Sequence, residues 1–221
     1  MKILPSAIAF SVIATLALSA CGTNVVSYRL DTDAKDARLT EVLNASKRVI
    51  ERRLQAMGEE SSVDIENTKG EIHIRVAVEA AVADALTQEL TAPFSMRIMT
   101  EAPAGKGDIN VEGQGSFQES GITEEHLVWV TAGTDANPEK GRVLLEFSED
   151  GRRLMGDIFR KNKGKYIGLF VRNHLVSKLL VEAEEVKESI LITDIPSILL
   201  AQIFADDLNV GLHATFTRDP S

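Results

Sequence analysis

The order in which short apolar runs alternate with helical segments most constrains the fold of this 221-residue chain. Residues 38–57 and 80–90 carry apolar side chains at the spacing of one helix face. Strand-like runs in the first half are residues 25–30, 63–65, 72–78 and 94–99. The resulting order, β-α-β-β-α-β, predicts two helices packed on one face of an antiparallel sheet.

The second half of the chain repeats this order roughly, with one added strand. Ser148 is a good N-cap for a helix whose first turn holds Glu149 and Asp150. A further helix begins at Pro196. Its strands are predicted at residues 127–130, 143–147, 165–171, 175–181, 189–192 and 212–217. The sequence therefore predicts an α+β protein with two ferredoxin-like subdomains, each built on an antiparallel sheet.

Composition indicates where the two subdomains are joined. Residues 102–122 are rich in glycine and polar side chains and match no phosphate-binding loop, so we interpret them as a linker. We expect residues 104–118 to let the subdomains move relative to each other. The predicted segments are 1–20, a signal peptide; 21–37, an anchor, tether and first strand; 38–101, the first subdomain; 102–122, the linker; and 123–221, the second subdomain.

The N-terminus has the features of an export signal. Lys2 is followed by an almost wholly apolar run, residues 3–17, which is too short to span a bilayer comfortably but fits the h-region of a signal peptide. Residues 18–21, Leu-Ser-Ala-Cys, then resemble the lipobox of bacterial lipoproteins. The alternative is an ordinary secretory signal with an incidental cysteine.

The lipobox resemblance implies cleavage before Cys21, whose sulfur would receive a diacylglyceryl group and whose new amine would be acylated. Stable attachment takes more than one acyl chain, because a single chain binds membranes only marginally. No later stretch approaches ~18 uninterrupted apolar residues, so we expect the lipid on Cys21 to be the membrane anchor. By resemblance to sorting in enteric bacteria, Gly22 in place of aspartate favours the outer membrane over the inner membrane.

Charge and cysteine content exclude several functions. The formal net charge is −9 at pH 7, and removing residues 1–20, whose only charged side chain is Lys2, makes it one unit more negative. An acidic surface argues against a nucleic acid partner, because phosphate neutralisation dominates that affinity. Cys21 is the only cysteine, so a lipidated chain has no thiol left for a disulfide or for catalysis.

Both halves resemble the first large periplasmic domain of SecD, the auxiliary subunit of the bacterial protein-export machinery. In the first half the likeness lies in residues 49–58, 69–76 and 94–98. In the second half it lies in residues 143–147, 150–151, 162–165, 190–193 and 207–212. The resemblance implies a membrane-near base and a mobile head, both ferredoxin-like, that contact emerging polypeptide.

The chain departs from SecD in three places. SecD proteins carry transmembrane helices with the charged residues that couple export to the proton gradient, and this sequence has no such segment. The Pro-Gly that follows the first hairpin in the family is absent from residues 76–80, and the proline that follows the second hairpin is absent from residues 177–180. We therefore expect that this chain does not couple export to the proton gradient by itself.

Candidate catalytic and metal-binding groups do not assemble in the sequence. The histidines have no metal-ligand spacing and no nucleophile motif beside them: His73, His126, His174 and His213. An acidic run could attract a cation, although a solvated strand edge explains it as well: Glu182, Glu184, Glu185 and Glu188. We expect no catalytic residue, no metal and no cofactor.

Basic side chains crowd the second half of the first helix: Lys47, Arg48, Arg52 and Arg53. A solvated face that suits the helix dipole explains them, and the alternative is a dock for an acidic partner. The predicted function is a non-enzymatic envelope lipoprotein, facing the periplasm, that binds exported polypeptides or Sec translocon subunits. The alternatives are a structural or regulatory lipoprotein of another assembly, and a hydrolase with a site between the subdomains.

Overall fold

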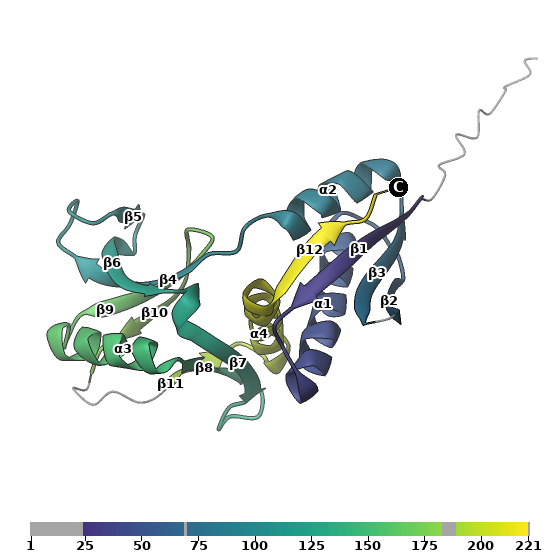
Figure 1. The fold of residues 1–221 in the computed structure, drawn as a ribbon. Coiled ribbons are helices and arrows are strands. Elements are labelled where there is room, and N and C mark those ends of the chain that lie inside the picture. Colours follow the sequence, from purple (N-terminus) through teal and green to yellow (C-terminus); the bar gives the residue numbers. More distant parts are fainter. Residues whose placement is uncertain (1–23, 69, 183–188, 221) are drawn as a thin grey trace, which may run out of the picture.

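The computed structural model describes residues 24–68, 70–182 and 189–220. Two lobes lie side by side, and helix α4 (Ile198–His213) lies between them (Figure 1). The predicted signal peptide, Cys21, Gly22 and three acidic residues, Glu184, Glu185 and Glu188, lie outside the described residues.

The first lobe contains both ends of the described chain, and we call it the terminal lobe. Its four-stranded antiparallel sheet has the order β12-β1-β3-β2, with α1 and α2 on one face. The elements are β1 (Asn24–Thr32), α1 (Asp36–Ala56), β2 (Val63–Thr68), β3 (Glu71–Val78), α2 (Ala80–Thr91) and β12 (Ala214–Arg218). Alternate side chains of β1 and β3 are buried against the helices, as the period of a half-covered strand requires.

The second lobe, the inserted lobe, lies between α2 and α4 in the sequence. One sheet has the order β10-β9-β4-β6-β5 and the other the order β11-β8-β7. Its elements are β4 (Met96–Ala102), β5 (Ile109–Val111), β6 (Gly115–Thr123), the 3-10 turn η1 (Glu124–His126), β7 (Leu127–Thr134), β8 (Gly141–Phe147), α3 (Glu149–Lys161), β9 (Tyr166–Val171), β10 (His174–Leu180) and β11 (Ser189–Ile195). Side chains from both sheets, α3 and α4 form one core.

Local sequence signals explain several element ends. The Ser148 side chain accepts a hydrogen bond from the Gly151 amide, which caps α3 as predicted. Arg172 and Asn173 form the turn between β9 and β10 with φ of 47° and 68°, the backbone that tight hairpins favour. Gly58, with φ of 84°, ends α1 as predicted.

The α+β class with antiparallel sheets is confirmed, but the assignment of two strands to subdomains was wrong. Residues 94–99 were expected to complete the first sheet, whereas β4 pairs with β6 and β9 in the inserted lobe. The last strand of the chain, β12, pairs instead with β1 of the terminal lobe. The terminal lobe therefore has the predicted β-α-β-β-α-β arrangement, but its final strand comes from the C-terminus.

The prediction that residues 102–122 form a linker between subdomains was also wrong, because β5 and most of β6 lie there within one sheet. The glycines have local geometric causes. A Cβ at Gly107 would lie 2.5 Å from the Phe117 carbonyl oxygen, and Gly113 has φ of 69° in the turn between β5 and β6. The lobes are joined instead through residues 92–95 and through α4.

Helix lengths in the described part of the chain set a limit on membrane crossing. Among residues 24–68, 70–182 and 189–220, no helix combines the length and the apolar content needed to span a bilayer.

Candidate functional site

The interface between α1 and α4 contains a buried carboxylate held by two arginines. Asp206 is only 2% exposed. Arg48 donates from Nε to Oδ2 at 2.8 Å and from Nη2 to Oδ1 at 2.7 Å. Arg52 donates from Nη1 to Oδ2 at 3.1 Å, and Gln202 donates to Oδ1 at 2.9 Å. We call this group of Arg48, Arg52, Gln202 and Asp206 the seam.

The seam lowers the pKa of Asp206. Burial alone would raise that pKa, but the hydrogen bonds from Arg48, Gln202 and Arg52 outweigh it. The carboxylate is therefore ionised at neutral pH, and it fixes α1 of the terminal lobe to α4.

The seam decides between the two interpretations of the basic residues on α1. Arg48 and Arg52 bind acidic groups of this chain, since Arg52 also donates to Asp207 at 3.0 Å. Lys47 lies 3.9 Å from Glu51 on its own helix. Arg48 and Arg52 are therefore neither a purely solvated face nor a free dock, Lys47 lies on the solvated face, and Arg53 has a different environment.

Asn209 and His213 attach α4 to β7. The Asn209 side chain accepts from the Val130 amide at 2.9 Å and donates to the Val130 carbonyl at 2.7 Å. His213 lies at the end of α4 rather than in the predicted last strand, with Nδ1 2.9 Å from Asp33 and Nε2 3.0 Å from the Val128 carbonyl. Residues 104–118 were predicted to let the lobes move, but they lie within one sheet of the inserted lobe and do not connect the two lobes.

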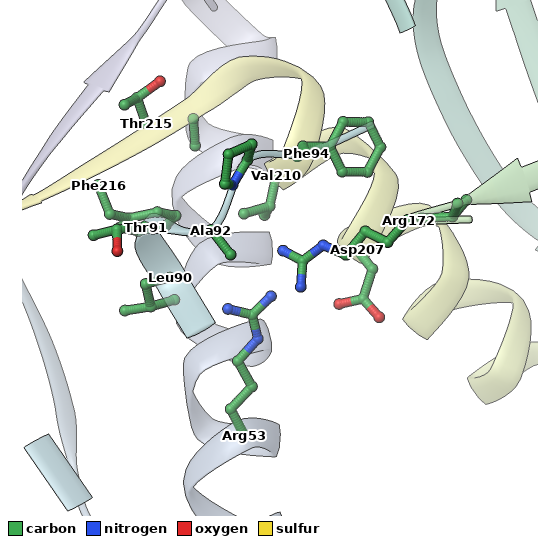
Figure 2. A pocket seen from close by; sticks show the side chains of 14 residues that line it. Arg53, Leu90, Thr91, Ala92, Phe94, Arg172, Asp207, Val210, Thr215 and Phe216 are labelled. Carbon is green, nitrogen blue, oxygen red and sulfur yellow. The ribbon is translucent and has the colours of Figure 1, made fainter. Parts of the chain in front are cut away.

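A cavity of about 300 Å³ opens beside the seam, at the junction of the two lobes. We call it the cleft. Figure 2 shows the guanidinium groups of Arg53 and Arg172 and the carboxylate of Asp207 lying in it. The wall consists mainly of apolar and backbone groups from α2, the connection to β4, α4 and β12: residues 90–94, 210–211 and 214–216.

The electrostatics of the cleft differ from those of the seam. Burial lowers the pKa of Arg53, and the nearby charge of Arg172 lowers it further. Within the described chain, no hydrogen bond or ion pair reaches the Arg53 guanidinium. Arg172 is 3.8 Å from Glu89. The cleft therefore contains a half-buried cation without a hydrogen-bonded counter-ion.

Phe94 forms one side of the cleft and packs directly on the backbone of α4. A Cβ at Gly211 would overlap the Phe94 ring, so glycine is required for this close approach. The contact fixes the chain where it passes from α2 into the inserted lobe.

The structure disperses the candidate residues named from sequence. His73 lies 3.0 Å from Asp219 on the terminal sheet, His126 lies in η1 beside Thr123, and His174 begins β10. Of the acidic run, Glu182 is described and is exposed. Within residues 24–68, 70–182 and 189–220, no three His, Cys, Asp or Glu side chains gather as a metal site.

Sequence analysis missed the acidic side of the seam and did not single out the cleft. An acidic pair, Asp206 and Asp207, within a largely apolar helix was the available signal that at least one of these carboxylates has a buried partner. Nothing local connected Arg172 with Arg53, because the two side chains come from different lobes.

Comparisons with known proteins give structural matches only. No family model matches the sequence, and no curated protein matches it significantly. SecDF from Thermus thermophilus, described as a translocon-associated membrane protein, matches with a TM-score of 0.54 and 16% identity over 90% of this chain and 30% of that chain. SecDF in its super-membrane-facing form gives 0.50 with the same identity and coverages.

A third structure, described as a membrane component SecDF that enhances protein export, is covered to 100%, with a TM-score of 0.49, 16% identity and 90% of this chain covered. The chain thus spans about 30% of the length of the first two SecDF chains. The resemblance predicted from sequence, to the first periplasmic domain of SecD, is confirmed as a similarity of fold.

Proposed function

We propose that this chain is a non-enzymatic envelope lipoprotein that binds exported polypeptide beside the protein-export machinery. The observation that carries the proposal is the cleft between two lobes of SecDF-like fold, which is lined by both apolar and charged side chains and is open to solvent. Polypeptide in transit is unfolded, so it presents apolar side chains and free backbone groups that such a surface can bind.

The cleft is suited to single side chains rather than to a folded partner. Leu90, Val210 and Phe216 are each less than 10% exposed, and with Phe94 they form an apolar wall around a volume of about 300 Å³. The edge strand β10 offers a second mode, strand addition, because it has one sheet neighbour among the described strands and exposes Val176 and Leu180.

The predicted anchor places this surface near a membrane. Only residues 22–23 separate Cys21 from β1, which begins at Asn24, so a lipid on Cys21 would hold the terminal lobe close to the bilayer. The proposed partners are therefore the membrane, through this lipid, and exported polypeptides or Sec translocon subunits. Gly22 supports the outer membrane as the site of attachment, with the protein facing the periplasm.

The hydrolase alternative receives little support from this arrangement. A hydrolytic site would need a base or a metal beside a substrate pocket. The described residues that line the cleft include no histidine, and one carboxylate there, Asp207, is bound to Arg52. A structural or regulatory role in another envelope assembly is the remaining alternative. The cross-linking test below distinguishes it from polypeptide binding.

The test is photo-cross-linking in living cells. A photo-reactive residue at Thr215, which is exposed and lines the cleft, is compared with one at Glu112, which is exposed in the distant turn between β5 and β6. We expect Thr215 to capture many different exported chains or export-machinery subunits, and Glu112 to capture few. Capture of one unrelated envelope protein at Thr215 would reject the export role.

Lipidation is tested separately with Cys21→Ser. We expect the wild-type chain to fractionate with membranes and to gain the mass of its acyl groups, and the variant to lose both properties. A Cys21→Ser chain that stays in the membrane fraction would show that attachment does not depend on this cysteine.

A further inference from the structure

Arg53 and Arg172 place two guanidinium groups in the cleft from opposite sides. Arg53 comes from the last turn of α1 in the terminal lobe, and Arg172 from the hairpin between β9 and β10 in the inserted lobe (Figure 2). We infer that these two arginines bind a carboxylate of the polypeptide, either its C-terminus or an acidic side chain, while its apolar neighbours contact Phe94 and Val210. This inference rests on the proposed function, because it names the group of the polypeptide that the cleft recognises.

The two cations lie close enough to oppose each other. Burial and the charge of Arg172 lower the pKa of Arg53, and the more weakly acting charges of Asp207 and Glu89 offset this only in part. A ligand carboxylate between the two groups would offset the repulsion and supply the hydrogen-bond acceptor that Arg53 lacks within the described chain.

The position of Arg172 is fixed by the backbone rather than by its counter-ion. Its amide donates to the Ser95 carbonyl at 2.9 Å, and its φ of 47° belongs to the tight turn. Glu89 lies 3.8 Å from its guanidinium, longer than a hydrogen bond. Arg172 can therefore accept a new acidic partner without a change in the hairpin.

The balance of charge selects a ligand with one negative charge. Three carboxylates form ion pairs with the four guanidinium groups at the junction: Asp206 and Asp207 pair with Arg48 and Arg52, Glu89 pairs with Arg172, and Arg53 has no ion pair within the described chain. Asp206 and Asp207 are already hydrogen-bonded by Arg48 and Arg52. A carboxylate compensates the one remaining positive charge and matches the planar fork of arginine, whereas a phosphate dianion would leave an excess negative charge beside Asp207.

The test measures peptide binding to the full chain in detergent by fluorescence anisotropy. Three labelled, unstructured apolar peptides are compared: one with a free C-terminal carboxylate, one amidated with an internal glutamate, and one amidated with glutamine at that position. We expect at least one of the carboxylate peptides to bind about tenfold more tightly than the neutral peptide. The free-carboxylate and glutamate peptides distinguish the two sources of the group.

Variants locate the effect. Arg53→Gln and Arg172→Gln should each abolish the preference for the carboxylate, and Arg53→Lys should keep part of it. The control Arg153→Gln, on exposed α3, should keep all of it. Circular dichroism checks that each variant is folded.

Three outcomes would overturn the inference. Equal binding of all three peptides would reject the carboxylate site but leave polypeptide binding intact. Binding of no peptide would reject both the inference and the proposed function. Stronger competition by inorganic phosphate than by acetate at equal ionic strength would reject the selection of a single negative charge.

Discussion

The seam and the cleft lie next to each other on α1, but their arginines differ in bonding: those of the seam are hydrogen-bonded to carboxylates, and Arg53 of the cleft is not, among the described residues. Arg52 donates to Asp206 and Asp207, whereas Arg53, one residue later, faces the cleft without a hydrogen-bonded partner in the described chain. Successive helix residues point about 100° apart, so neighbours in sequence belong to different surfaces. A basic run on a helix can therefore combine a structural ion pair with a binding group.

In the seam every charged group is hydrogen-bonded to a partner within the chain, whereas in the cleft Arg53 has no hydrogen-bonded partner in the described chain. Asp206 accepts four hydrogen bonds from three residues on two helices. Such a network makes the orientation of α1 and α4 specific, because a partly satisfied buried charge is costly. Arg53 is partly buried and has only the nearby charges of Asp207 and Glu89 to offset that burial, without a hydrogen bond to either of them in the described chain.

Breaking the seam should have the largest effect on stability. Asp206→Ala leaves Arg48 and Arg52 without their shared acceptor, and we expect a loss of about 3 kcal/mol in the free energy of unfolding, at the lower end of the range for buried pairs because both arginines are partly exposed. Urea denaturation measures it. The control Asp207→Ala, at an exposed carboxylate, should cost less than about 1 kcal/mol, and equal losses would contradict a special role for Asp206.

The contact of Phe94 with Gly211 should give the next largest effect. Gly211→Ala places a methyl group where the ring lies, and we expect a loss of about 2 kcal/mol from overpacking. In the background of Phe94→Ala the same change should cost little. A double-mutant cycle measures this coupling, and strictly additive losses would show that the close approach is unimportant.

Acid should weaken the seam and leave the cleft cations unchanged. The pKa of Asp206 is lower in the folded chain than in the unfolded chain, so its contribution to stability is present above the unfolded value of about 4 and is lost as pH falls through the folded value. Unfolding free energy measured from pH 7 to pH 2 should fall less steeply below pH 4 in Asp206→Asn than in the wild type. Parallel curves would contradict the assignment.

Removing the cleft cation should have the smallest effect on stability. Arg53→Met keeps most of the apolar stem and removes a charge that has no hydrogen-bonded partner, so we expect a change within about 0.5 kcal/mol. Arg48→Met, which removes the bidentate bond to Asp206, is the matched comparison and should cost more. A larger loss for Arg53→Met would place Arg53 in the structural network.

Local patterns predicted much of the fold. The helices, most strands, the Ser148 cap and the turn at Asn173 follow from spacing and from backbone preferences that act within a few residues. The exchange of β4 and β12 between lobes does not follow in this way. Both runs are apolar and of ordinary strand length, and the pairing of β12 with β1 joins the two ends of the described chain.

The site was harder to predict than the fold because its side chains come from segments that are far apart in the sequence. Arg53 was noted only as part of a basic run, because its surroundings depend on Arg172, more than one hundred residues away. The glycines of residues 102–122 suggest a flexible linker by composition, whereas Gly107 is required by close packing against Phe117. Composition alone does not separate these two causes.

The most direct test of the account is hydrogen–deuterium exchange on the full chain in detergent, with and without a saturating unfolded exported polypeptide. We predict that bound polypeptide slows exchange in the cleft segments, residues 90–94 and 214–216, and leaves the exchange rates of residues 42–50 in α1 unchanged. Protection confined to the seam helix or to the turn between β5 and β6, with none in the cleft segments, would contradict the claim that the cleft is the binding site.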